Sequence, residues 1–123
     1  MPNQVVWFDM PVQNLDRAVT FYSAVLGAPV TKQQFQNMSF AVLPHQGEEV
    51  SGCLTPGCDG DGAKPSQDGA LLYFNCQGRL DAAIAAVEPS GGRVLQAKHP
   101  IGPYGFRSVV LDSEGNRIAL HST

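Results

Sequence analysis

The chain carries the same arrangement of residues twice, and this duplication limits the folds it can adopt. A strand-like run at residues 5–12 leads into a helix-like run that ends at Gly27. A second strand-like run at residues 70–76 leads into a helix-like run that ends at Gly91-Gly92. Two modules of this size must pack together, because neither alone could bury its apolar face. We therefore expect function in the space between them.

Length and composition describe one ordinary globular domain. The 123 residues include 43% apolar and 15% charged side chains, which suits a single core and argues against disorder. The net charge of −3 comes without a Lys/Arg stripe, so we expect no nucleic-acid partner. No apolar run approaches the ~20 residues that span a bilayer, so we expect no membrane partner.

The cysteines and the first residues of the chain bear on location. Cys53, Cys58 and Cys76 form no zinc-type CxxC pair, so we expect thiols and no disulfide framework. The start of the sequence lacks the basic residues and apolar stretch of a signal peptide. Both features predict a reducing, cytoplasmic location.

Hydrophobic periodicity predicts one helix and four strands in each module. In the first module, a helix capped by Asn14 and ended by Gly27 accompanies strands near residues 4–12, 30–35, 38–43 and 49–54. In the second module, a helix at 79–88 accompanies strands near 70–76, 93–98, 105–112 and 117–121. The order β-α-β-β-β, twice, is an α+β arrangement with helices outside a curved, partly open sheet around a central cavity.

These boundaries divide a single domain, residues 1–123, into three parts. Module one covers about residues 1–55, and module two covers about residues 70–123. The residues between them, about 56–69, are rich in turn-forming types and have no apolar periodicity, which is typical of a linker.

Two stretches of the sequence resemble a known superfamily. Residues 14–27, NLDRAVTFYSAVLG, are similar to the "DLxRAxxFYxxxLG" phrase of the vicinal oxygen chelate superfamily. This superfamily includes glyoxalase I, bleomycin-resistance proteins and extradiol dioxygenases. Residues 112–121, DSEGNRIALH, are similar to its closing "DPDGNxIEL" phrase. The resemblance covers essentially the whole chain and is more specific for fold than for activity, because one scaffold hosts many chemistries.

The resemblance also implies four positions that hold metal ligands in relatives. At three or more of these positions, this chain has no side chain that can coordinate a metal. In metal-dependent relatives the first strand of each module supplies a His or similar ligand, where this chain has Trp7 and Leu71. The closing strand normally carries Glu, where this chain has Ala119, and residues 51–53 lack a carboxylate as well. Indole, isobutyl and methyl groups cannot coordinate a divalent cation. We therefore predict no metal cofactor, with a divalent metal at a non-standard site as the alternative.

Strand alternation predicts which side chains face the cavity. If Met10 and Val12 pack under the first helix, their neighbours Trp7 and Asp9 face inward. Prolines and glycines make residues 98–107 a stiff loop beside the cavity mouth. The candidate ligand-binding residues are Trp7, Asp9, Met38, Tyr73, Asn75, Tyr104, Phe106 and His121.

Asp9 is a carboxylate within an apolar strand, a placement that costs several kcal/mol unless the charge is paired. One interpretation is that Asp9 receives a cationic ligand, with Trp7 or Tyr73 adding a cation–π face. The other is that it forms a salt bridge with Arg107 or Arg117, or pairs with an N–H group at the sheet.

These features predict a small-molecule-binding protein of the glyoxalase/bleomycin-resistance type, metal-free, that sequesters an organic ligand of cationic or aromatic character. The alternative is a glyoxalase I-like lyase or a dioxygenase-type enzyme, with a non-standard metal or with Asp9 and His121 as acid and base. A third interpretation is an interaction module whose cavity is vestigial. The resemblance further implies a homodimer.

Overall fold

The computed structural model describes residues 3–56 and 64–123, and it has the predicted order of elements. The first module contains β1 (Asp9–Pro11), α1 (Leu15–Leu26), β2 (Thr31–Phe35), β3 (Met38–Val42) and β4 (Cys53–Thr55). The second contains β5 (Leu72–Asn75), α2 (Leu80–Val87), β6 (Arg93–Pro100), the 3-10 helix η2 (Gly102–Tyr104), β7 (Phe106–Leu111) and β8 (Arg117–Ser122). Part of the predicted linker, residues 57–63 with Cys58, lies outside the described residues.

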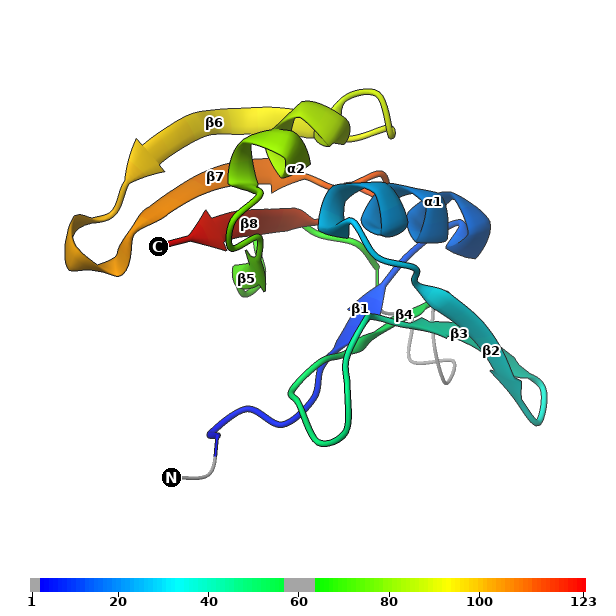
Figure 1. Cartoon of the computed structure of the whole chain (residues 1–123). Helices are drawn as coiled ribbons and strands as arrows, with labels where there is room; N and C mark the ends of the chain where they lie inside the picture. Colours follow the sequence, from blue (N-terminus) through cyan, green and yellow to red (C-terminus); the bar gives the residue numbers. More distant parts are fainter. Residues whose placement is uncertain (1–2, 57–63) are drawn as a thin grey trace.

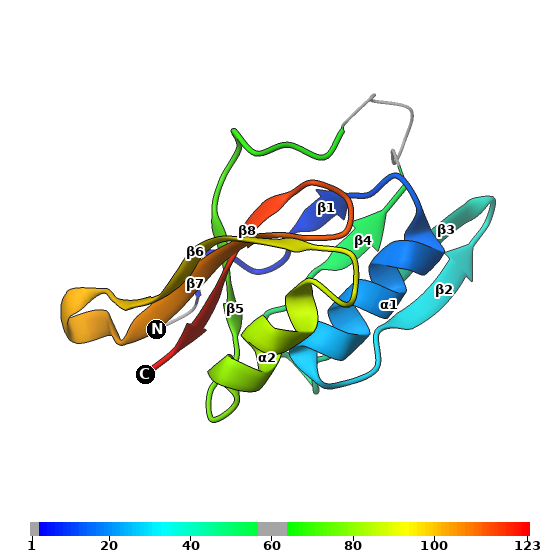
Figure 2. The same cartoon turned by 90° about the horizontal axis from the view of Figure 1, so that it is seen from above.

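Each module forms one four-stranded mixed sheet, and the two sheets have the same strand order. The orders are β1-β4-β3-β2 and β5-β8-β7-β6. In each, the first pair is parallel and the other pairs are antiparallel. Figures 1 and 2 show α1 and α2 side by side, each against its own sheet. The predicted α+β fold of two βαβββ modules is confirmed.

Both modules contribute to one hydrophobic core beneath the helices. The aromatic ring of Tyr22 in α1 lies 5.5 Å from that of Phe74 in β5, so the core is continuous across the modules. Met10 and Val12 are buried, as strand alternation predicts, while Tyr73 on the other face of its sheet is half-exposed. The described helices include none long and apolar enough to cross a membrane.

The ends of α1 follow the sequence prediction. Asn14 lies in the extended region and its side-chain oxygen accepts a hydrogen bond from the Arg17 amide at 3.0 Å. Gly27 adopts φ 69°, the left-handed conformation that glycine tolerates best, and its N–H donates to the Ser23 carbonyl at 3.1 Å. The two caps therefore fix the ends of α1 on either side of its buried apolar residues.

The first strand is shorter than its sequence predicts. The apolar run at residues 4–12 indicates one long strand, but β1 covers Asp9–Pro11 alone. Its partner β4 is equally short, and residues 4–7 are exposed without a partner among the described strands. A strand is defined by the backbone groups that pair with it, so apolar composition alone overestimates its length.

Glu114, in the turn between β7 and β8, connects the second module to the start of α1. One carboxylate oxygen accepts hydrogen bonds from the backbone amides of Gln13 and Asn14, both at 2.8 Å. Arg17 donates to both carboxylate oxygens, at 2.7 and 2.9 Å, and Ser113 adds a further bond. Burial alone would raise the pKa of Glu114, but these hydrogen bonds outweigh it and lower the pKa to about 2.

Asp112, in the same turn, is buried and accepts four hydrogen bonds. The Tyr22 hydroxyl of α1 donates to it at 2.5 Å, and Asn116 donates through its backbone and side-chain nitrogens. The Glu114 amide provides the fourth bond. Burial, with the nearby Asp112 charge, raises the pKa of Tyr22 well above its ordinary value, so Tyr22 remains a neutral donor. Residues 112–116 are therefore a link between the modules as well as a tight turn.

Candidate functional site

A row of polar side chains crosses the β5–β8 sheet on the face away from the core. Residues in register on neighbouring strands share a face. Arg107 on β7 is in register with His99 on β6 and with His121 on β8, and His121 is in register with Asn75 on β5. We call these four residues the polar row. Its neighbours in sequence, such as Phe74 and Leu120, point the other way into the core.

Arg107 is held in place by two hydrogen bonds within this face. Its Nε donates to His99 Nε2 at 3.0 Å, and its Nη1 donates to the Tyr73 hydroxyl at 2.6 Å. His99 Nδ1 lies 2.8 Å from the carbonyl oxygen of Ala97. A carbonyl can only accept, so His99 carries its proton on Nδ1 and accepts from Arg107 as a neutral ring. The guanidinium carbon lies 5.9 Å from the centroid of the Tyr73 ring.

A small cavity lies against Tyr73, which accepts a hydrogen bond from Arg107, and against His121, which is in register with Arg107. It has a volume of about 350 Å³ and is lined by Tyr73, Ile101, Tyr104 and His121. His121 Nε2 lies 2.6 Å from the carbonyl oxygen of Tyr104, so this nitrogen carries a proton. The His121 ring stands edge-on to the Tyr73 ring, with the ring centroids 6.1 Å apart. The wall is therefore aromatic, with polar atoms at fixed positions.

A larger cavity lies on the other side of Tyr73, between the two modules. Its volume is about 540 Å³. The lining residues come from the segment before β1, the end of α1, the loop after β3 and strand β5; they are Val5, Phe8, Leu26, Ala28, Leu43, Pro44, Val50, Ser51, Leu71, Leu72, Tyr73, Phe74 and Asn75. Most of these side chains are apolar. Tyr73 thus borders both this cavity and the one that it lines with Tyr104 and His121.

Asp9 lies in a third cavity, of about 320 Å³, and its environment differs from the expected one. Asp9 is exposed, so the cost of burying its charge does not arise. Its carboxylate accepts a hydrogen bond from the Cys53 thiol at 3.0 Å, and it forms no ion pair with Arg107 or Arg117, both of which are described. Lys64 and Arg117 line the same cavity, so two cationic side chains already accompany this carboxylate.

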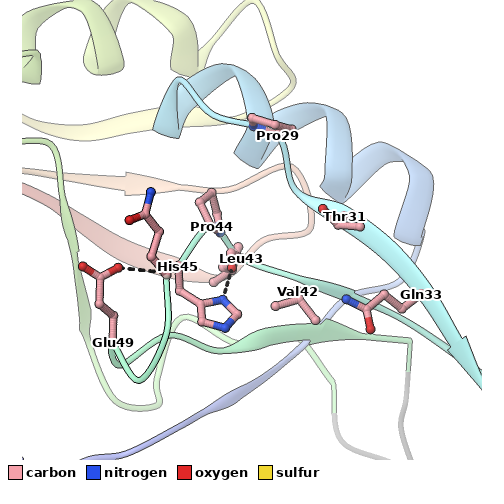
Figure 3. Close-up of a pocket in the computed structure, with 9 residues that line it drawn as sticks. Pro29, Thr31, Gln33, Val42, Leu43, Pro44, His45 and Glu49 are labelled. Carbon is pink, nitrogen blue, oxygen red and sulfur yellow. Dashed lines mark hydrogen bonds between the residues drawn. The ribbon is translucent and has the colours of Figure 1, made fainter.

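A further cavity, of about 670 Å³, lies in the first module between β2, β3 and the loop that follows β3. Figure 3 shows His45 and Glu49 at its loop end and Thr31 and Gln33 along β2. His45 Nδ1 lies 3.2 Å from the Leu43 carbonyl, and Glu49 accepts from the Gln46 amide at 2.9 Å. These local bonds stabilise the loop itself, and no second charged residue faces Glu49 from the lining.

The structure brings some of the predicted site residues together. Tyr73, Tyr104 and His121 line one cavity, and Asn75 lines the neighbouring one with Tyr73. Asp9 is separated from them in the third cavity.

Three other predicted residues line none of these four cavities. Trp7 is half-exposed and its ring meets His45 edge-on, 5.8 Å away. Met38 begins β3 at the tip of the β2–β3 hairpin, in register with Phe35. Phe106 is in register with Ser122, and the Lys98 ammonium lies over its ring. Because Lys98 also forms an ion pair with Asp81 of α2, Phe106 lies on the face of its sheet that the helix covers. Alternation places the next residue, Arg107, on the face where Phe106 was expected.

Sequence reasoning did not bring Arg107 and His99 together on the face that carries the polar row. The sequence feature that could have revealed Arg107 is the tight turn at residues 112–116. Counting outward from this turn along the antiparallel strands β7 and β8 pairs Arg107 with His121. The thiols of Cys53 and Cys76 were expected. Burial raises the pKa of Cys76, which makes it a poor nucleophile.

The described residues do not fit a divalent metal centre. Trp7 faces His45, Leu71 lines the cavity between the modules, and Ala119 is buried with only a methyl group to offer. Within residues 3–56 and 64–123, no three His, Cys, Asp or Glu side chains come together in a way that could hold a metal ion. No reaction step through a metal is therefore derived from this arrangement.

Known families and structures resemble the chain over nearly its full length. The family model described as Glyoxalase/Bleomycin resistance protein/Dioxygenase superfamily matches residues 4–120. A glyoxalase/bleomycin resistance protein from Albidiferax ferrireducens T118 has a TM-score of 0.78 and 21% identity, covering 98% of this chain and 99% of that one. A glyoxalase/bleomycin resistance protein/dioxygenase family enzyme from Burkholderia phytofirmans PsJN has a TM-score of 0.73 and 14% identity, covering 95% and 96%.

A superfamily member from Sphaerobacter thermophilus DSM 20745 is similar to the same extent, with a TM-score of 0.71, 20% identity and coverage of 99% and 98%. The comparison with curated proteins gives no match. At these identities the solved structures establish the fold alone.

Proposed function

Because the chain belongs to the glyoxalase/bleomycin resistance protein/dioxygenase superfamily, we propose that it binds a small organic molecule against Tyr73, without a metal centre. The observation that carries this proposal is the position of Tyr73. Its ring is 49% exposed and borders cavities of about 350 and 540 Å³. Both volumes fall in the range of small-molecule sites, which are mostly apolar with a few oriented polar groups.

An aromatic ligand suits this environment. Tyr73, Tyr104 and the His121 ring offer faces and edges against which a planar ligand can stack. The structure gives less support to a cationic ligand. Asp9 shares its cavity with Lys64 and Arg117, whose positive charges would repel a cation there. Sequestration needs only affinity, so the lack of lone-pair donors at Trp7, Leu71 and Ala119 is consistent with this function.

The catalytic alternative would use Asp9 and His121 as an acid and base on one substrate. These two residues line separate cavities, and no described cavity contains both. General acid–base catalysis requires both groups within hydrogen-bond reach of the reacting molecule. The geometry therefore favours binding over this form of catalysis.

We also propose that the protein forms a homodimer. Exposed large apolar side chains include Val5, Val6 and Trp7, which follow one another in the segment before β1. Exposed apolar surface of this kind is typical of a protein–protein interface. Sedimentation equilibrium should give twice the chain mass, and a monomer at all concentrations would contradict the proposal.

A thermal-shift screen tests ligand binding. Small aromatic compounds should raise the melting temperature of the wild-type protein, because a ligand that binds only the folded state stabilises it. Tyr73→Ala should abolish that rise. Phe35→Ala is the matched control, since Phe35 is an exposed aromatic residue in the other sheet, and it should leave the rise intact. Equal shifts for both variants, or none for the wild type, would contradict the proposed site.

A further inference from the structure

Resting on the proposed function, we propose that the site is selective for an aromatic anion whose carboxylate, or similar oxyanion, is held by Arg107 together with Tyr73. This assigns a charge class to the ligand and a binding role to a residue that the superfamily resemblance does not mark.

Arg107 has no acidic partner among the described residues. The three ion pairs there are Arg17–Glu114, Lys32–Asp16 and Lys98–Asp81. The polar row contributes two histidines and an asparagine beside Arg107, and no carboxylate. Arg107 is half-buried, so its charge is less screened than that of a fully exposed arginine. An anionic ligand would supply the missing countercharge.

The guanidinium is already oriented before a ligand arrives. Nε is bound to His99 and one Nη1 hydrogen to Tyr73, so two of its five N–H groups are used. The neutral tautomer of His99 is set by the Ala97 carbonyl, which leaves Nε2 as an acceptor. A side chain fixed in this way loses little conformational freedom on binding, and the free N–H groups can donate to an oxyanion.

Tyr73 connects this charge to the cavity. Its oxygen accepts from Arg107 at 2.6 Å, so its own hydroxyl proton is free to donate elsewhere. Tyr73 lines the cavity of about 350 Å³ with Ile101 and Tyr104, a volume that suits a ligand with one aromatic ring. An oxyanion at the Arg107 side of Tyr73 would receive charge-assisted hydrogen bonds while its ring packs against the aromatic wall.

Three one-ring probes of similar shape test the charge preference: benzoate, benzamide and benzylammonium, compared at equal ionic strength. Binding is measured by nuclear magnetic resonance on the full chain, following the side-chain Nε–H signals of the arginines. The Arg107 signal is identified by its loss in Arg107→Gln. Benzoate should shift this signal and bind more tightly than either other probe.

The variants separate charge from packing. Arg107→Gln should weaken benzoate binding roughly tenfold or more, as expected for a lost charged hydrogen-bond donor. Tyr73→Phe, which keeps the ring and removes the hydroxyl, should weaken it by a smaller factor. Arg93→Gln removes an exposed arginine from the start of β6 in the same sheet and should leave benzoate affinity unchanged.

The outcomes distinguish this inference from the proposed function. If benzamide or benzylammonium binds at least as well as benzoate, and Tyr73→Ala abolishes that binding, a ligand site exists but the anion preference is overturned. If benzoate affinity is the same in Arg107→Gln and Arg93→Gln, Arg107 is not the anchor. If none of the three probes binds the wild-type protein, both this inference and the proposed one-ring site are overturned.

Discussion

Glu114 is the residue through which the second module contacts the start of α1 most directly. Its carboxylate accepts five hydrogen bonds, four of them from residues 13–17 in the first module. The turn that carries it, residues 112–116, was predicted from Gly115 and Asn116, but the turn composition does not reveal what its acidic side chains contact. Hydrogen bonds between residues about a hundred positions apart cannot be derived from local sequence, because they depend on how the modules pack.

The low pKa of Glu114 predicts how stability depends on pH. Its folded-state pKa of about 2 lies below the ordinary value of 4.5, so its contribution is fully present above about pH 4.5 and is lost as the pH falls toward 2. Glu114→Gln removes the charge, and we expect it to lower the free energy of unfolding at neutral pH by about 1–3 kcal/mol. Denaturant titrations at pH 7, 4 and 3 measure both effects.

In this experiment the variant should lose less stability between pH 7 and pH 3 than the wild type, because it lacks the carboxylate that takes up a proton in this range. Asp16→Asn is a matched control, because Asp16 is an exposed carboxylate in the first turn of α1. Identical pH slopes for the wild type and Glu114→Gln would show that Glu114 is not the linked group.

At the scale of elements, the two helices and the order of helices and strands along the chain followed from periodicity and from the caps of α1. The lengths of the first and fourth strands did not, because pairing over Cys53–Thr55 limits both β1 and β4. The direction of Phe106 was also missed. Residues 98–107 contain a bulged strand and a 3-10 helix, and this irregularity hides the alternation that places Arg107, and not Phe106, in the polar row.

Gly92, between α2 and β6, tests how closely the elements pack. A Cβ added there would lie 2.6 Å from Cε1 of Phe21 in α1 and would also collide with the carbonyl oxygen of Leu111 in β7. We expect Gly92→Ala to destabilise the protein by about 1–3 kcal/mol through overpacking. Gly69→Ala is the control, because a Cβ at Gly69 meets nothing within 4 Å, and its effect should stay within about 0.5 kcal/mol.

Urea unfolding of the two variants measures the difference. If Gly92→Ala is as stable as Gly69→Ala, the contact between the end of α2, α1 and β7 is looser than described. The helices could then shift relative to each other without cost, and the shared core would not hold the two sheets in a fixed arrangement.

At the scale of the whole molecule, the duplicated sequence predicted two packed modules, and the structure has two sheets of equal strand order around a shared core. The sequence predicted one central cavity, whereas the described residues line several separate ones. Single-sequence patterns indicate which face of a strand a residue occupies. They do not indicate how the curved sheets and loops divide the space, so they could not reveal that Asp9 lies in a different cavity from Tyr73, Tyr104 and His121. The homodimer and the cytoplasmic location remain predictions.

We propose that the whole molecule holds its ligand without a metal centre. The most direct test is to incubate untagged, purified protein with Zn²⁺, Ni²⁺, Mn²⁺ or Fe²⁺, remove unbound metal, and measure metal per chain by mass spectrometry of the elements. We predict far less than one ion per chain for each metal, because Trp7, Leu71 and Ala119 provide no ligand atoms. One tightly held ion per chain would contradict the claim.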